Sequence, residues 1–138
     1  MREHEGASSK YASKTDPTDL YYMYCHYGMN ASMTSQVKSM MSKISSPSDF
    51  MFVGDTFYTS VPARGWYVMH QCWVDGGGSV DGRHNGFANI LFGDGHAESL
   101  NTNMGSTPRE QYTGTKNPYA KAPFDNNSTL NPRWYAIP

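Results

Sequence analysis

The chain has 138 residues, of which 11 are basic and 12 acidic, so its formal net charge is -1. Such a sparse and balanced charge gives no electrostatic basis for binding nucleic acid or an anionic membrane surface. Ten tyrosines, six phenylalanines and three tryptophans stand beside 13 glycines and 8 prolines, which indicates one loop-rich domain held together by aromatic side chains.

The N-terminal part predicts a lead-in followed by an aromatic strand. Residues 1–19 are polar, and we expect a flexible segment before a single domain that spans residues 20–138. Residues 20–27 contain four tyrosines, which favours a β-strand, and Gly28 is expected to end it.

A short helix and a buried strand are predicted next. Apolar residues recur at steps of three and four between Met33 and Ile44, which indicates one apolar stripe on an amphipathic helix; they are Met33, Val37, Met40, Met41 and Ile44. Residues 49–57 carry bulky side chains at both even and odd positions, which predicts a strand buried on both faces.

The middle of the chain combines a strand candidate with a glycine run. Residues 66–74 alternate in a way that predicts another strand. Residues 75–82 contain three consecutive glycines between Asp75 and Asp81, which favours a flexible surface turn. A phosphate-binding loop is excluded, because the run lacks the Lys and Ser or Thr that such a loop requires.

Residues 86–100 are predicted to form a β-hairpin around which the rest is organised. Asp94-Gly95 is a typical two-residue hairpin turn, which would pair Phe92 with Ala97. The core face of the hairpin would then carry Ala88, Ile90, Phe92 and Ala97. We therefore expect an α+β fold, in which a short helix packs on an antiparallel sheet.

The C-terminal tail, residues 101–138, lacks hydrophobic periodicity and is expected to be irregular. It ends in the apolar cluster 134–138, which is costly to leave in water. We expect the tail to wrap across the domain and pin this cluster onto the core.

Three segments share a pattern with a known family. They are Tyr27-Gly28-Met29-Asn30, then Ile44-x-x-Pro47-Ser48 followed by a strand that contains Asp55, then His84 with nine residues before Asp94-Gly95 and His96, with Asn89 inside the strand. In order and spacing they resemble the H-x9-DG proteins, which are prepilin-like proteins similar to the major pseudopilins of type II secretion systems.

The resemblance implies a pseudopilin-like globular head that acts as a non-enzymatic structural subunit of a secretion pseudopilus or pilus-like filament. Its partners would be other pilin-like subunits or copies of itself, and it would be exported to the cell envelope, the periplasm or the exterior. The residues that match the motif would hold shape rather than catalyse: Asp55, His84, Asn89, Asp94, Gly95 and His96.

Family members reach the membrane through a long apolar N-terminal helix, whereas residues 1–5 here are polar. We expect either that this helix has been removed from the chain or that the protein is a relative that kept only the head.

Two other functions remain open at this point. Exposed Trp66, Trp73 and Trp134 would favour a module that binds carbohydrate or peptide. A small metal-dependent hydrolase would instead use His84, Asp94 and His96. Geometry weighs against the hydrolase, because an extended chain between His84 and the turn spans over roughly 20 Å.

Two further features are possible. Calcium could bind oxygen ligands from Asp75 and Asp81, since the resembling pseudopilins often hold calcium in a loop of the sheet; otherwise we expect no cofactor. Cys25 and Cys72 could form one disulfide in an exported protein, whereas two buried thiols are expected in the cytoplasm.

Overall fold

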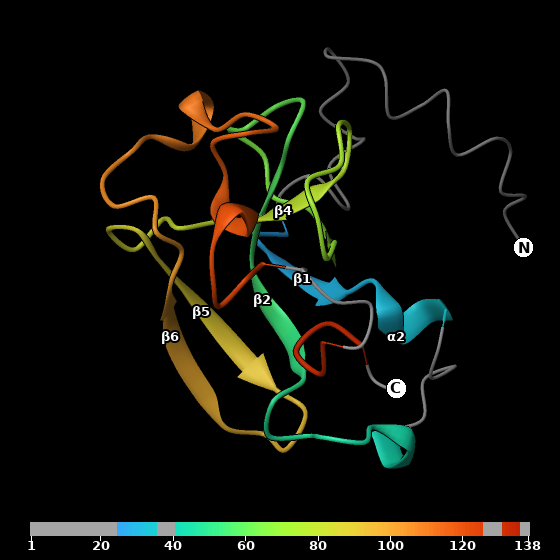
Figure 1. Cartoon of the computed structure of the whole chain (residues 1–138). Helices are drawn as coiled ribbons and strands as arrows, with labels where there is room; N and C mark the ends of the chain where they lie inside the picture. Colours follow the sequence, from blue (N-terminus) through green and yellow to red (C-terminus); the bar gives the residue numbers. More distant parts are fainter. Residues whose placement is uncertain (1–24, 36–40, 126–130, 136–138) are drawn as a thin grey trace, which may run out of the picture.

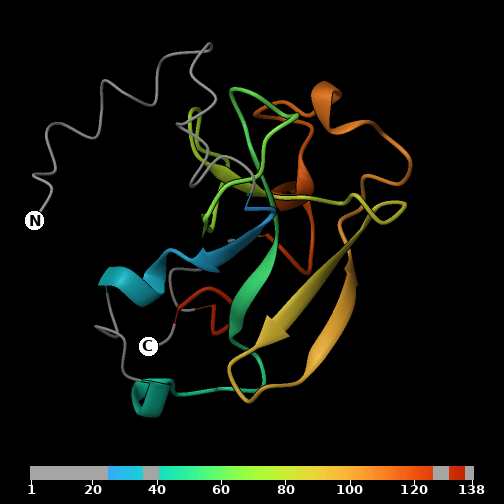
Figure 2. The same cartoon turned by 180° about the vertical axis from the view of Figure 1, so that it is seen from behind.

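A computed structural model describes residues 25–35, 41–125 and 131–135 of the chain. The fold is dominated by a mixed sheet whose strand order is β3-β1-β2-β5-β6, with β4 also paired to β2 (Figures 1 and 2). Within the described ranges the strands are β1 (Tyr27–Asn30), β2 (Met51–Tyr58), β3 (Val68–Met69), β4 (Gly78–Val80), β5 (Phe87–Phe92) and β6 (Ala97–Asn101). The short helices are α2 (Ser32–Ser35), η1 (Met41–Lys43), η2 (Arg109–Gln111) and η3 (Pro118–Ala120).

The sheet is not purely antiparallel as predicted. Strand β1 runs antiparallel to β2 but parallel to β3. The parallel pairing follows from the connection between β2 and β3. The loop after β2 passes β1 and places β3 on the far side of β1, at the edge of the sheet. Of the predicted strand 66–74, only Val68 and Met69 pair in this way.

In the described part of the chain the first strand starts at Tyr27, and it does not end at Gly28 as predicted. Residues 20–24 lie outside the described part, and β1 runs through Gly28 to Asn30. A Cβ atom at Gly28 would lie 2.7 Å from Thr56 Cγ2 and 2.9 Å from the carbonyl carbon of Val68. Glycine at this position therefore permits the close approach of β1 to its two neighbours.

Where a helix was predicted over residues 33–44, the described part has the single α-helical turn α2 and the 3-10 helix η1, and residues 36–40 lie outside that part. Asn30 precedes α2, and its Oδ1 accepts hydrogen bonds from the backbone N–H and the hydroxyl of Ser32, both at 3.0 Å. Met33 and Ile44, from the predicted apolar stripe, are buried against Phe50.

The predicted strand 49–57 and hairpin are both confirmed, but the register of the hairpin is shifted by one residue. Leu91 pairs with Ala97, and the N–H of Phe92 donates to the carbonyl of His96 at 2.9 Å, so the loop has three residues. The reason lies outside the hairpin. The N–H groups of Gly93 and Asp94 donate to the carbonyls of Phe50 at 2.9 Å and Pro47 at 3.2 Å, which holds the loop against the segment before β2.

The shifted register changes which side chains face the core. Ala88, Ile90 and Phe92 are buried as predicted, whereas Ala97 is exposed. Because Ala97 pairs with Leu91, it lies on the opposite face of the sheet from Ile90.

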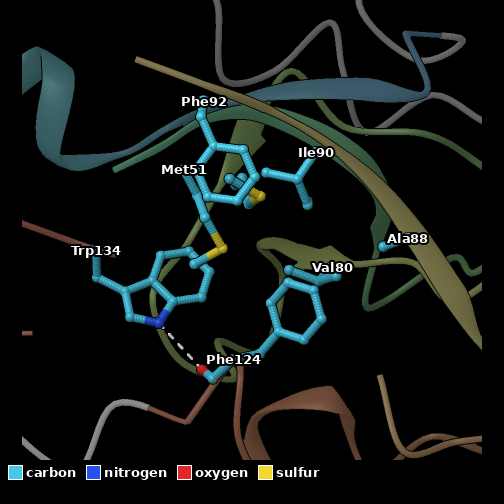
Figure 3. Close-up of a cluster of buried hydrophobic side chains, with 8 residues drawn as sticks. Met51, Val80, Ala88, Ile90, Phe92, Phe124 and Trp134 are labelled. Atoms are coloured by element: carbon cyan, nitrogen blue, oxygen red, sulfur yellow. Dashed lines mark hydrogen bonds between the residues drawn. The ribbon is translucent and has the colours of Figure 1, made fainter. Parts of the chain in front are cut away.

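The main core lies on one side of the sheet and includes the C-terminal tail (Figure 3). Strand residues Met51, Val80 and Ile90 meet Phe124 and Trp134 of the tail, and all five side chains are fully buried. The indole N–H of Trp134 donates to the carbonyl of Phe124 at 3.1 Å (Figure 3). The tail therefore packs onto the core at Trp134, as predicted, while residues 136–138 lie outside the described part.

The glycine run is a surface turn only in its first half. Asp75 and Gly76 are exposed, but β4 begins at Gly78, and its three residues are buried beside β2. A Cβ atom at Gly78 would lie 1.8 Å from the carbonyl oxygen of Val68. The lack of a side chain at Gly78 thus serves the close packing of strands.

Replacing Gly78 with alanine should destabilise the domain by about 1–3 kcal/mol, the usual cost of overpacking an interior. The matched control is Gly114→Ala, where the nearest atom to a new Cβ lies 3.8 Å away and stability should change little. Urea unfolding followed by tryptophan fluorescence measures both variants. Equal unfolding midpoints would contradict the close packing of β4 against β3.

Candidate functional site

A buried carboxylate is the centre of the candidate site. The side chain of Asp55, on β2, is fully buried, and its Oδ2 accepts the backbone N–H of Asn89 on β5 at 2.7 Å. The same oxygen lies 3.2 Å from His84 Nε2, while Oδ1 lies 3.5 Å from Arg83 Nε. Asp55 therefore bonds to its neighbouring strand and attracts two basic side chains from the loop before that strand.

That loop folds back sharply, which places His84 beside Asp55. Asn85 and Gly86 have φ values of +56° and +86°, and the N–H of Gly86 donates to the carbonyl of Gly82 at 2.8 Å. A Cβ atom at Gly86 would lie 2.6 Å from the carbonyl oxygen of Gly105, so glycine is required there for space as well as for conformation.

A second buried carboxylate extends the network. Asp81 is 1% exposed, and its Oδ2 lies 3.0 Å from Arg83 Nη2 and 2.8 Å from Arg109 Nη1. Arg83 Nη2 also donates to the carbonyls of His26 at 3.0 Å and Thr56 at 2.8 Å. Two carboxylates are thus matched by two guanidinium groups whose side chains are each 24% exposed. We refer to Asp55, Asp81, Arg83, His84 and Arg109 as the ion-pair network.

Beside this network lies an open cleft of about 400 Å³, with Arg83, Arg109 and Tyr112 on its walls. Burial, together with the nearby charge of Asp81, raises the pKa of Tyr112 to about 12. This hydroxyl therefore stays protonated at neutral pH and does not itself act as a general base there.

The remaining motif residues form a separate cluster at the hairpin loop. Asp94 Oδ1 accepts the backbone N–H of His96 at 3.1 Å and lies 2.5 Å from the ring Nδ1 of the same residue. These two bonds, the backbone one first, lower the pKa of the Asp94 carboxyl. The His96 ring also stacks on Phe92, with 4.3 Å between ring centroids. Gly95 has a φ of +94° and completes the loop.

His84 and Asp94 are not brought together. They lie at opposite ends of β5, and His84 contacts Asp55 instead. Across the described ranges, no three His, Cys, Asp or Glu side chains are grouped so that they could hold a metal ion. The ligand set His84, Asp94 and His96 of the hydrolase hypothesis is therefore split between two places.

The two aspartates considered for calcium also have different environments. Asp75 is exposed in the turn before β4, and its Oδ1 accepts the indole N–H of Trp73 at 2.8 Å. Asp81 follows β4 and is bound by two arginines. Calcium binding at this pair stays a prediction.

The cysteines and tryptophans also differ from expectation. Cys25 and Cys72 are free thiols and both are exposed, which matches neither the possible disulfide nor the alternative of two buried thiols. Cys25 Sγ donates to the carbonyl of Tyr27 at 2.9 Å. Trp134 is fully buried, and Trp66 is half-buried and stacked on Tyr58 at 4.4 Å between centroids. Trp73 is also half-buried. A platform of three exposed tryptophans is therefore not present.

Sequence reasoning missed the arginines of the network and the role of Asp81 as their partner. The sequence did contain a signal for Asp81 and Arg83, because both lie within three residues of the motif residue His84. Arg109 comes from the tail, which has no periodicity that would predict its position. Asn89, a predicted motif residue, makes the contact with Asp55 through its backbone N–H, while its side chain accepts a hydrogen bond from the Ser99 hydroxyl.

No family model matches the chain, and no curated protein or solved structure matches it either. Within the described ranges, the helices are too short and too polar to cross a bilayer.

Asp55→Asn should lower the free energy of unfolding by about 1–3 kcal/mol, because it removes the charge that faces Arg83 and leaves an amide group in its place at a fully buried position. Asp94→Asn is the matched control: Asp94 is exposed, and the substitution keeps the Oδ1 acceptor, so stability should change little. Urea unfolding at pH 7 measures both. A smaller loss for Asp55→Asn than for Asp94→Asn would show that the network does not stabilise the fold.

Stability should fall as the pH drops from about 7 towards 5. Burial lowers the pKa of His70, and burial with the charges of Arg83 and Arg109 lowers the pKa of His26. The unfolded chain, with ordinary histidine pKa values, therefore binds more protons than the folded chain below about pH 6.5, which favours unfolding. Unfolding free energies measured across this range should show a flatter profile for His70→Gln than for the wild type. Parallel profiles would refute the contribution of His70.

Proposed function

We propose that the chain is the globular head of a pseudopilin-like protein and acts as a non-enzymatic structural subunit of a secretion pseudopilus or pilus-like filament at the cell envelope. The α+β arrangement, with a short helix on the sheet, belongs to the same proposal. It rests on the resemblance in sequence and on the part that each matching residue has in the fold.

The contact between His84 and Asp55 is the single observation that carries the proposal. The two residues belong to different segments of the shared pattern, and their side chains meet at 3.2 Å, with Asp55 fully buried and His84 47% exposed. Asn89, from the same pattern, completes the contact through its backbone at 2.7 Å. The pattern thus marks a structural contact between β2 and the loop before β5, as expected for residues that hold shape.

The remaining segment, Tyr27–Asn30, and Pro47 of the second segment have comparable roles. Asn30 caps α2, and its Nδ2 donates to the carbonyl of Met51 at 2.8 Å, which ties β1 to β2. The carbonyl of Pro47 accepts the N–H of Asp94, which ties the Ile-x-x-Pro-Ser segment to the hairpin loop. Each segment therefore connects two parts of the sheet, and these roles require no substrate or cofactor.

An epitope inserted after Gly114, which is exposed in a loop, allows the proposal to be tested in cells. If the chain is a filament subunit, the tag should appear in filaments sheared from the envelope and decorate them along their length under immunogold labelling. The same tag on Asp55→Asn should be absent from filaments, because the head no longer folds well.

Two outcomes would refute this function. One is a tagged wild-type protein that never sediments with filaments or other pilin-like subunits. The other is a metal-dependent hydrolytic activity of the purified chain that is lost in His84→Ala.

A further inference from the structure

Strand β6 forms one edge of the sheet. It pairs with β5 on one side, and no strand of the described ranges pairs with its other side. Both views show β6 at the margin, with no ribbon of a strand or helix beyond it (Figures 1 and 2). An edge of this kind has backbone groups available for another strand.

The hydrogen-bond pattern identifies which residues have these groups. At the two ends of the β5–β6 pair, the N–H of Phe92 donates to the carbonyl of His96 and the N–H of Thr102 donates to the carbonyl of Gly86. Bonded and non-bonded pairs alternate along an antiparallel ladder, so the even-numbered residues of β6 bond to β5. The N–H and C=O groups of Ala97, Ser99 and Asn101 therefore point outward.

The strand has few of the features that protect an edge from pairing. Proteins commonly protect edges with lysine, proline, a β-bulge or a covering segment. The sequence of β6 is Ala-Glu-Ser-Leu-Asn, and its pairing with β5 is regular over all five residues. Its single charge, Glu98, pairs with Ile90, so it lies on the opposite face from Ala97 and Ser99.

Exposed apolar side chains lie next to the outward-facing residues. Leu91 pairs with Ala97 and is 37% exposed, and Phe87 pairs with Asn101 and is 39% exposed. Directly paired residues share a face of the sheet, so both lie on the same open face as the side chain of Ser99. A strand added to β6 would extend this face and cover part of its apolar surface.

We propose that β6 pairs with β6 of a second copy of the chain, antiparallel and centred on Ser99. In this register Ser99 lies opposite Ser99, and Ala97 lies opposite Asn101, so all the outward-facing residues form bonded pairs. Each Glu98 lies opposite a Leu100, which keeps the two negative charges from facing each other directly. The sequence of β6 is thus complementary to itself in this register.

This inference goes beyond the proposed function and does not depend on it. A two-fold contact closes on itself and yields a dimer, whereas a filament requires a head-to-tail contact through other surfaces.

Charge substitutions at Ser99 test both the pairing and its register. Ser99→Lys and Ser99→Glu each place two like charges opposite each other, so each variant alone should be monomeric in sedimentation equilibrium, while an equimolar mixture should regain the dimer. The matched control is Ser48→Lys, at an exposed position in the loop before β2, which should dimerise like the wild type. Concentrations from about 10 μM to 1 mM cover the range expected for a modest interface.

A wild-type chain that remains monomeric at 1 mM would overturn the proposal, as would a dimer unaffected by either Ser99 substitution or a mixture that fails to regain it. Hydrogen exchange of the wild type is independent of how the variants fold. The Ser99 amide should exchange more slowly in concentrated than in dilute solution, and an exchange rate independent of concentration would also overturn the proposal.

Discussion

The buried carboxylate of Asp55 is the constraint on which the arrangement of the central strands depends. A carboxylate removed from water is costly unless hydrogen bonds and opposite charges surround it. Here the backbone N–H of Asn89 supplies the hydrogen bond, Arg83 supplies the opposite charge, and the ring of His84 lies 3.2 Å from the carboxylate. Any other register between β2 and β5, or another path for the loop before β5, would leave this charge unpaired in the interior.

The same constraint explains the spacing of the H-x9-DG pattern in this chain. Asn85 and Gly86 form the turn after His84, six residues form β5, and Gly93 begins the hairpin loop, which together make up the nine residues before Asp94. The nine-residue spacing therefore corresponds to the length of β5 together with the turn before it and the first residue of the loop after it. It keeps His84 at Asp55 and Asp94 at Pro47, at opposite ends of β5, rather than bringing the two residues to one reaction centre.

The ion-pair network also joins the tail to the sheet. Arg109 binds Asp81, which follows β4, while Phe124 and Trp134 of the tail fill the main core. An isolated buried ion pair contributes little net stability, because desolvation offsets its attraction, but it strongly disfavours alternatives that leave one charge unpaired. The network thus specifies how the irregular tail docks, and the aromatic residues provide most of the stabilisation through their buried area.

Local patterns in the sequence were sufficient for β2, for β5 with its alternating core residues, and for the burial of Trp134, because each depends on which side chains avoid water. They were insufficient for the register of the hairpin, which follows from bonds between its loop and Phe50 and Pro47. They also could not reveal β4, because a glycine run in a sequence indicates a flexible turn. Only the tertiary structure shows that a Cβ atom at Gly78 would lie 1.8 Å from the carbonyl oxygen of Val68. The partner of His84 likewise depends on tertiary structure, because residues 29 positions apart meet only after β2 and β5 have paired.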